Sequence, residues 1–156
     1  SILSSDKVMC PLHRFRLELA RKCKREHLAA AFGKFDGGSY VRSVDECLDA
    51  FRFSIVIEND ISDYYFSERL TSCFAAQTIP VYLGARKIAD FFNPDGIIFL
   101  QDTDLAHAAK TLEQCTKETY GERLSAVLDN YKRVQEYSNM QDYLYEHYLQ
   151  EGTKKA

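Results

Sequence analysis

The residues best suited to chemistry lie in one stretch of the chain, residues 53–84. An apolar segment there ends on Glu58–Asp60, and after an aromatic loop a helix is predicted to begin at Ser67–Arg69. A carboxylate in the first helical turn can accept hydrogen bonds from the two vicinal hydroxyls of a ribose. A neighbouring arginine can bind a phosphate together with the free backbone N–H groups of that turn. Glu68 and Arg69 also fit plainer roles, as support for the helix start and as a solvated surface cation.

The loop before this helix contains Tyr64, Tyr65 and Phe66, which are more aromatic side chains than an ordinary loop carries. Some of them must pack, and one or two could flank a base or contact a phosphate through a hydroxyl group. The loop follows the most apolar predicted strand, where open parallel sheets bind their ligands. These residues therefore predict a ligand site at the carboxyl edge of a sheet.

The elements that would position this site alternate between strand and helix. Such alternation is typical of a three-layer, Rossmann-like α/β fold with a parallel sheet and right-handed crossovers. The hydrophobic patterns predict strands at 2–4, 27–32, 53–57, 79–83 and 97–100, and helices at 13–25, 44–50, 67–76, 86–92, 104–115, 120–131 and 134–149. We expect residues 1–156 to form a single domain that is helical from about residue 103 and frayed over residues 152–156.

Composition narrows the function classes. The chain has 156 residues, 46% hydrophobic and 28% charged, with a formal net charge of −3, which favours a globular domain over a nucleic-acid binder. No apolar run reaches the roughly 18 residues that a membrane-spanning helix needs. The five cysteines and four histidines are dispersed, so we expect no metal site and no resident cofactor. Cysteines of this kind favour a cytoplasmic setting, compatible with peripheral attachment to a membrane.

The central segment resembles a known family. FSIVIEND, DYYFSERLTSCFAAQTIPVYLG and IADFFNPDGIIFL are similar to the C-terminal, donor-binding half of the glycosyltransferase family 10 α1,3/4-fucosyltransferases. That family shows FxxxxENS, then YxTEK, then IPIYWG. The resemblance is dense over residues 51–100, extends back to Ile2, and fades in the helical tail.

The resemblance implies roles for individual residues. Glu58 and Asn59 match the family's Glu-Asn pair, whose asparagine lies near the donor's phosphate and sugar. Tyr65 matches a tyrosine that contacts the donor, and Glu68 matches the glutamate that binds the ribose hydroxyls. Arg69 stands where the family usually has a lysine for the diphosphate.

The family also has an arginine at the start of the first helix that meets the β-phosphate. Two residues of HRFR could supply it, Arg16 as the first choice and Arg14 as the second, and both also fit a solvated helix face. Asp60, Ser67 and Leu83 replace the family's serine, threonine and tryptophan. These departures fit a relative whose sugar or acceptor differs.

The resemblance further implies the second half of a GT-B enzyme, which transfers fucose from GDP-fucose to a glycan hydroxyl with inversion and without a metal ion. The general base belongs to an N-terminal acceptor-binding domain that we expect to lie outside these residues, so the catalytic residue is unknown. This chain alone should bind donor and turn over nothing. A eukaryotic member would face the Golgi lumen.

Two other functions stay open. The chain could serve a transferase that uses another GDP or UDP sugar. It could also be a non-catalytic interaction domain whose tail docks a partner through its tyrosines, Tyr131, Tyr137, Tyr143, Tyr145 and Tyr148. A dinucleotide oxidoreductase is disfavoured, because Ser4–Lys7 rather than GxGxxG follows the first strand.

Overall fold

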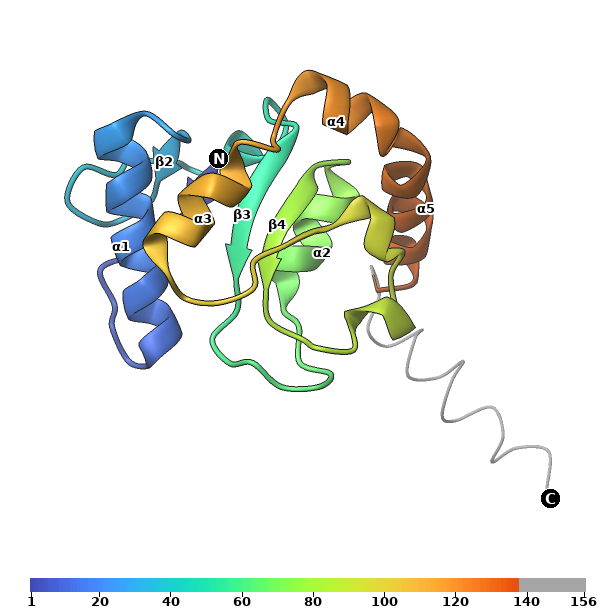
Figure 1. Cartoon of the computed structure of the whole chain (residues 1–156), viewed down its shortest axis with the longest axis horizontal. Helices are drawn as coiled ribbons and strands as arrows, with labels where there is room; N and C mark the ends of the chain where they lie inside the picture. Colours follow the sequence, from blue (N-terminus) through green and yellow to red (C-terminus); the bar gives the residue numbers. More distant parts are fainter. Residues whose placement is uncertain (138–156) are drawn as a thin grey trace, which may run out of the picture.

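A five-stranded sheet, in which every pair of neighbouring strands is parallel, forms the centre of the molecule (Figure 1). The computed structural model describes residues 1–137. The strand order is β2-β1-β3-β4-β5. The strands are β1 (Ile2–Leu3), β2 (Ala31–Phe32), β3 (Phe53–Ile57), β4 (Ile79–Leu83) and β5 (Ile98–Phe99).

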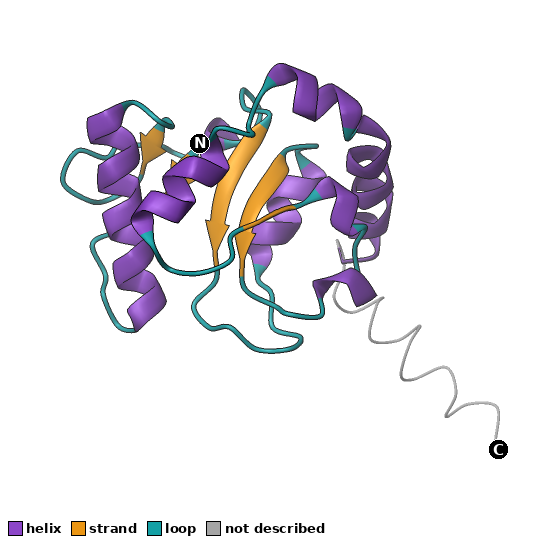
Figure 2. Ribbon diagram, in the orientation of Figure 1, coloured by secondary structure: helices purple, strands orange, loops and turns teal. Residues whose placement is uncertain are grey.

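Helices cover both faces of this sheet, which gives the three layers expected from the sequence (Figure 2). The helices are α1 (Pro11–Glu26), α2 (Glu68–Ala75), α3 (Leu105–Leu112), α4 (Lys117–Glu122) and α5 (Leu124–Val134). Phe15 and Leu19 of α1 share one buried cluster with Ile55 and Val81 of the sheet. Phe74 of α2 shares the other cluster with the opposite face of the sheet. The predicted Rossmann-like architecture is confirmed.

The order of the strands fixes where a ligand can bind. From β1 the chain crosses through α1 to β2 on one side, and it later returns to β3 on the other side of β1. The connections that leave β1 and β3 therefore diverge at their carboxyl ends. Such a switch point opens a crevice in α/β sheets.

The two central strands are confirmed with the bounds predicted from their hydrophobic pattern, 53–57 and 79–83. They are paired in register, Ile55 opposite Val81 and Ile57 opposite Leu83. All five residues of β4 are buried, as expected for a parallel strand covered on both faces.

The predicted strand over residues 27–32 is wrong in extent, since β2 contains only Ala31–Phe32. His27 ends α1 in a left-handed conformation with φ 57°, which turns the chain before the strand begins. Two predicted helices, 44–50 and 86–92, are short 3₁₀ turns at Asp45–Cys47 and Ile88–Asp90.

The predicted helix 120–131 is also different, because the chain forms two helices that meet at Arg123. Of the last predicted helix, 134–149, only the 3₁₀ turn Gln135–Tyr137 falls within the described residues. The expected frayed tail, 152–156, lies outside them. No helix within residues 1–137 is long and apolar enough to cross a membrane.

Candidate functional site

A buried carboxylate anchors the start of α2. The Glu58 side chain, directly after β3, has no exposed surface. Its oxygens accept hydrogen bonds from the Ser67 backbone N–H at 2.9 Å and from the Ser67 hydroxyl at 2.6 Å. Arg69 Nη1 lies 3.5 Å from the same carboxylate and donates to Ser67 Oγ at 3.0 Å. Glu58 therefore fixes both the first turn of α2 and one side of the Arg69 guanidinium.

The Tyr82-Leu83-Gly84 segment completes the surroundings of Glu58. The Tyr82 hydroxyl accepts a hydrogen bond from the Ala85 N–H at 2.9 Å, and burial raises the pKa of this hydroxyl. A Cβ atom at Gly84 would clash with the Tyr82 hydroxyl and would lie 2.6 Å from Glu58 Cγ. Only glycine allows these two side chains to pack here.

We expect Gly84→Ala to lower the free energy of unfolding by about 2 kcal/mol, because the added methyl group overpacks a buried site. Urea unfolding followed by circular dichroism measures this loss. Gly121→Ala is the matched control, since a Cβ atom there meets no atom within 4 Å. Equal stabilities of the two variants would contradict the packing described here.

A buried arginine lies beside this anchor. Arg16 of α1 is only 6% exposed, and its Nη1 donates to the Ile57 carbonyl at 2.8 Å and to Asn59 Oδ1 at 3.4 Å. No ion pair to Arg16 occurs among residues 1–137. Desolvation and the positive charge of Arg69 lower the pKa of Arg16. A buried cation without an acidic partner is costly, so this geometry indicates an anionic ligand.

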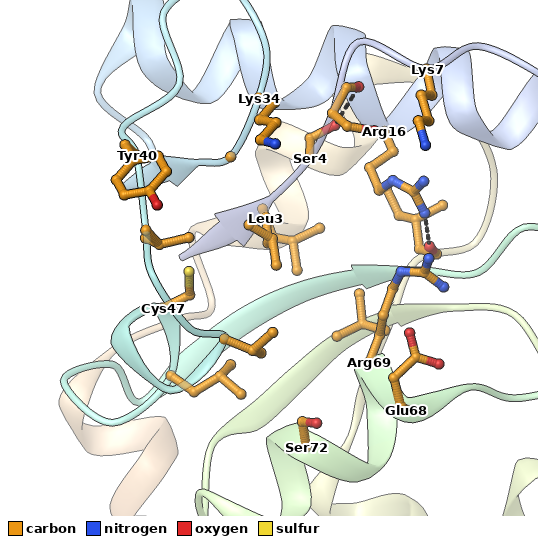
Figure 3. A pocket seen from close by; sticks show the side chains of 18 residues that line it. Leu3, Ser4, Lys7, Arg16, Lys34, Tyr40, Cys47, Glu68, Arg69 and Ser72 are labelled. Atoms are coloured by element: carbon orange, nitrogen blue, oxygen red, sulfur yellow. Dashed lines mark hydrogen bonds between the residues drawn. The ribbon is translucent and has the colours of Figure 1, made fainter.

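The two arginines face one cavity at the carboxyl edge of β1, β2 and β3, with a volume of about 500 Å³. Figure 3 shows the charged ends of Lys7, Arg16, Arg69 and Glu68 gathered at one side of this cavity. Tyr40 lies at the opposite side (Figure 3), and the chain that follows it adds the apolar residues Val41, Val44 and Leu48 to the lining. The cavity therefore has a charged end and a largely apolar end.

The charge of the cavity differs from that of the whole chain. Its lining contains four cations, Lys7, Arg16, Lys34 and Arg69, and Glu68 is the one acidic residue among them. No ion pair to Glu68 occurs within residues 1–137. A chain with a net charge of −3 thus concentrates positive charge at the switch point. This arrangement suits a diphosphate joined to a group that carries hydroxyls.

Comparison with known proteins identifies the family. The family model for the C-terminal region of glycosyltransferase family 10 (fucosyltransferase) matches residues 9–123, which is most of the chain. The chain belongs to glycosyltransferase family 10. The predicted resemblance to the C-terminal half of this family is therefore confirmed.

Individual relatives agree with this family. An α-(1,3)-fucosyltransferase FucT of Helicobacter pylori is 29% identical over 65 residues, which are 42% of this chain and 14% of that enzyme. A crystal structure of an α1,3-fucosyltransferase with GDP-fucose matches with a TM-score of 0.61 and 18% identity, and one with GDP matches equally. Each match covers 89% of this chain and 47% of the crystallised protein. The fold is that of one half of a GT-B fucosyltransferase, and the chain spans about half of each crystallised protein.

The structure brings together three of the predicted family 10 site residues. Arg16, Glu68 and Arg69 line the same cavity, although they come from α1 and from the first turn of α2. Glu58 is buried, lies next to Arg69 and is not part of the lining. Asn59 lies beside Arg16 and accepts its hydrogen bond.

Two other predicted residues lie apart from the cavity. Arg14 is exposed and lines a separate hollow with Met9 and Glu18. Tyr65, 43% exposed, lies in the loop before α2 and is absent from the cavity lining. The geometry therefore distinguishes the two candidate arginines of α1 and favours Arg16.

The loop that carries Tyr65 is held by contacts on both sides. Asp63 lies 3.4 Å from Lys87 Nζ, and the Lys87 ammonium group also donates to the Tyr64 hydroxyl at 3.0 Å. Phe66 packs edge-on against Phe91. Of the three loop aromatics, Phe66 therefore packs against the core, Tyr64 holds the loop to Lys87, and Tyr65 is exposed.

Lys7, Lys34 and Tyr40 line the cavity, although the sequence did not single them out. A signal for the lysines was present, since Lys7 follows β1 and Lys34 follows β2, so both lie at the carboxyl edge.

All five cysteines are free. No group of three or more His, Cys, Asp or Glu residues suited to a metal occurs in the described part of the chain. The tail tyrosines Tyr143, Tyr145 and Tyr148 lie outside that part.

Proposed function

We propose that this chain is the donor-binding half of an inverting fucosyltransferase and that its cavity holds GDP-fucose. The single observation that carries the proposal is the buried guanidinium of Arg16, which has no ion pair within residues 1–137 and shares one cavity with Arg69. Two guanidinium groups offer paired N–H donors that match the oxygens of a diphosphate. Family membership and the fold of proteins crystallised with GDP-fucose and GDP support this ligand.

In the proposed complex the donor lies along the cavity. The diphosphate occupies the charged end near Arg16 and Arg69, with Lys7 adding positive charge. The Glu68 carboxylate accepts hydrogen bonds from the ribose hydroxyls, as an acidic residue does in dinucleotide-binding units. The largely apolar end, lined by Tyr40, Val41 and Leu48, suits the flat nucleobase.

The proposed reaction places this chain on the leaving-group side. An acceptor glycan hydroxyl attacks the anomeric carbon of the fucose, and the new C–O bond forms as the bond to the diphosphate oxygen breaks. A base on the N-terminal acceptor-binding domain takes the hydroxyl proton. Arg16 and Arg69 stabilise the negative charge that grows on the departing GDP, a role that a divalent cation fills in other transferases. The isolated chain would therefore bind GDP without transferring fucose.

Glu68→Ala tests the ribose contact. We expect GDP to bind this variant about tenfold more weakly in calorimetry, because a charged hydrogen-bond acceptor is lost. The wild-type chain should also lose about tenfold in affinity for 2′,3′-dideoxy-GDP, and the variant should no longer distinguish the two nucleotides. Glu122→Ala, an exposed acid on α4, is the matched control. Identical GDP affinities of Glu68→Ala and wild type would remove Glu68 from the site.

A donor with a different sugar is the second candidate, and one residue favours it. The exposed carboxylate of Asp60 follows Asn59 at the position where family 10 has serine. The negative charge of Asp60 would repel a nearby diphosphate, so it would favour a donor whose phosphates bind farther from Asp60. A thermal-shift panel separates the candidates: the largest stabilisation by GDP-fucose supports the first, and by another nucleotide sugar the second.

A further inference from the structure

We propose that His13 is a positioning residue that sets the orientation of the Asn59 amide and, through it, the orientation of the Arg16 guanidinium. This inference rests on the proposed role of Arg16 in binding the diphosphate. His13 and Arg16 are three residues apart on α1, so they lie on the same face of the helix. Both side chains reach Asn59 Oδ1, in the segment that follows β3.

The hydrogen bonds determine which nitrogen of His13 carries the proton. The Met9 backbone N–H donates to His13 Nδ1 at 3.2 Å, so Nδ1 must be unprotonated. In the neutral ring the proton then resides on Nε2, which lies 2.8 Å from Asn59 Oδ1. His13 therefore donates to the amide oxygen.

Asn59 Oδ1 also accepts the hydrogen bond from Arg16 Nη1 at 3.4 Å. Two donors thus meet one oxygen, and an amide rotated by 180° would present its NH₂ group to both. His13 destabilises the rotated amide, because His13 Nε2–H and the Asn59 NH₂ group would then face each other as two donors. The same restriction leaves the Asn59 amide nitrogen without a partner among residues 1–137.

Correct orientation matters because, among residues 1–137, Arg16 donates just two hydrogen bonds, both from Nη1. One goes to the Ile57 carbonyl at 2.8 Å, and the other goes to Asn59 Oδ1. Loss of the second acceptor would let the guanidinium rotate about its bond to the Ile57 carbonyl. Its remaining N–H donors would then be less well aligned with a diphosphate, whose binding depends on the direction of the paired donors.

A purely structural role for His13 makes a different prediction. No side chain caps the first turn of α1, and His13 Nδ1 satisfies the Met9 N–H just before the helix. If only this contact mattered, an acceptor near Nδ1 would suffice. Asparagine supplies such an acceptor but lacks the donor at Nε2, whereas glutamine supplies a donor near Nε2 but not the acceptor.

His13→Asn and His13→Gln are therefore a matched pair for titration with GDP by calorimetry. The positioning role predicts about tenfold weaker binding for His13→Asn and binding within about twofold of wild type for His13→Gln. In an Arg16→Met background the two variants should bind alike. The reverse order of affinities, or equal effects in both backgrounds, would overturn the proposal.

A measurement without nucleotide separates this inference from the proposed function. Nitrogen-15 NMR of the unliganded chain follows rotation of the Arg16 guanidinium. We expect slow rotation in wild type and His13→Gln, and fast rotation in His13→Asn. Equal rotation rates in all three would overturn the positioning role, even if GDP binds. Failure of wild type to bind GDP would overturn the proposed function alone, and the rotation rates would still decide the role of His13.

Discussion

Replacing Arg16 with methionine is expected to weaken GDP binding by at least about 30-fold while leaving the chain as stable as the wild type. The binding loss follows because a buried cation that meets the diphosphate disappears, and such losses amount to about 2–5 kcal/mol. The stability should change by less than about 1 kcal/mol. Arg16 is 6% exposed and has no acidic partner in the described chain, so removing it relieves desolvation and offsets the lost hydrogen bond to the Ile57 carbonyl.

Calorimetry with GDP and urea unfolding of the same samples check both halves of this prediction. Arg14→Met is the matched control, since Arg14 lies two residues away on the exposed side of α1 and lines a different hollow. That variant should bind GDP like wild type. A result in which Arg16→Met unfolds several kcal/mol more easily yet binds GDP normally would show that Arg16 holds the fold and not the ligand.

Glu58→Ala is expected to lower the free energy of unfolding by about 3 kcal/mol. The Glu58 carboxylate is fully buried and accepts two hydrogen bonds from Ser67, and hydrogen bonds to charged groups contribute about 1.5–3 kcal/mol each. The substitution also leaves the Arg69 guanidinium without the carboxylate 3.5 Å away. GDP affinity should fall as well, because the start of α2 loses its anchor.

Chemical denaturation of Glu58→Ala and Glu68→Ala side by side provides the measurement. The two acids lie ten residues apart in sequence, but Glu68 is exposed and without an ion pair among residues 1–137. We expect Glu68→Ala to change stability by less than about 0.5 kcal/mol, as exposed substitutions generally do. Similar stabilities of the two variants would mean that Glu58 does not anchor α2.

Glu58 illustrates why a sequence resemblance and a structure can assign different roles to the same residue. The sequence predicted Glu58 and Asn59 together as donor-binding residues. Successive residues of an extended segment point to opposite sides, so one of them turns into the protein and the other toward its surface. Glu58 is accordingly enclosed near Ser67 and Tyr82. Its contribution to donor binding remains a prediction, now through Arg69.

The short flanking strands show a second limit. The strands β3 and β4 lie at the centre of the sheet and bury nearly every residue, so their apolar runs predicted them with the observed bounds. β1, β2 and β5 contain two residues each. Such short strands exist because neighbouring strands pair with them, and that pairing leaves little trace in the local pattern.

Local patterns of the sequence alone determined the alternating α/β architecture, the two central strands, the helix start at Ser67 and the resemblance to family 10. Each of these depends on contacts between residues close in the chain or on one hydrophobic period. The tertiary structure alone decided that Arg16 and not Arg14 shares a cavity with Arg69, and that Lys7 and Lys34 line the same cavity. Residues two apart on a helix point about 200° away from each other, so only packing against β3 selects one of the two arginines. The cavity itself exists because β1 and β3 are neighbours in space while their connections diverge.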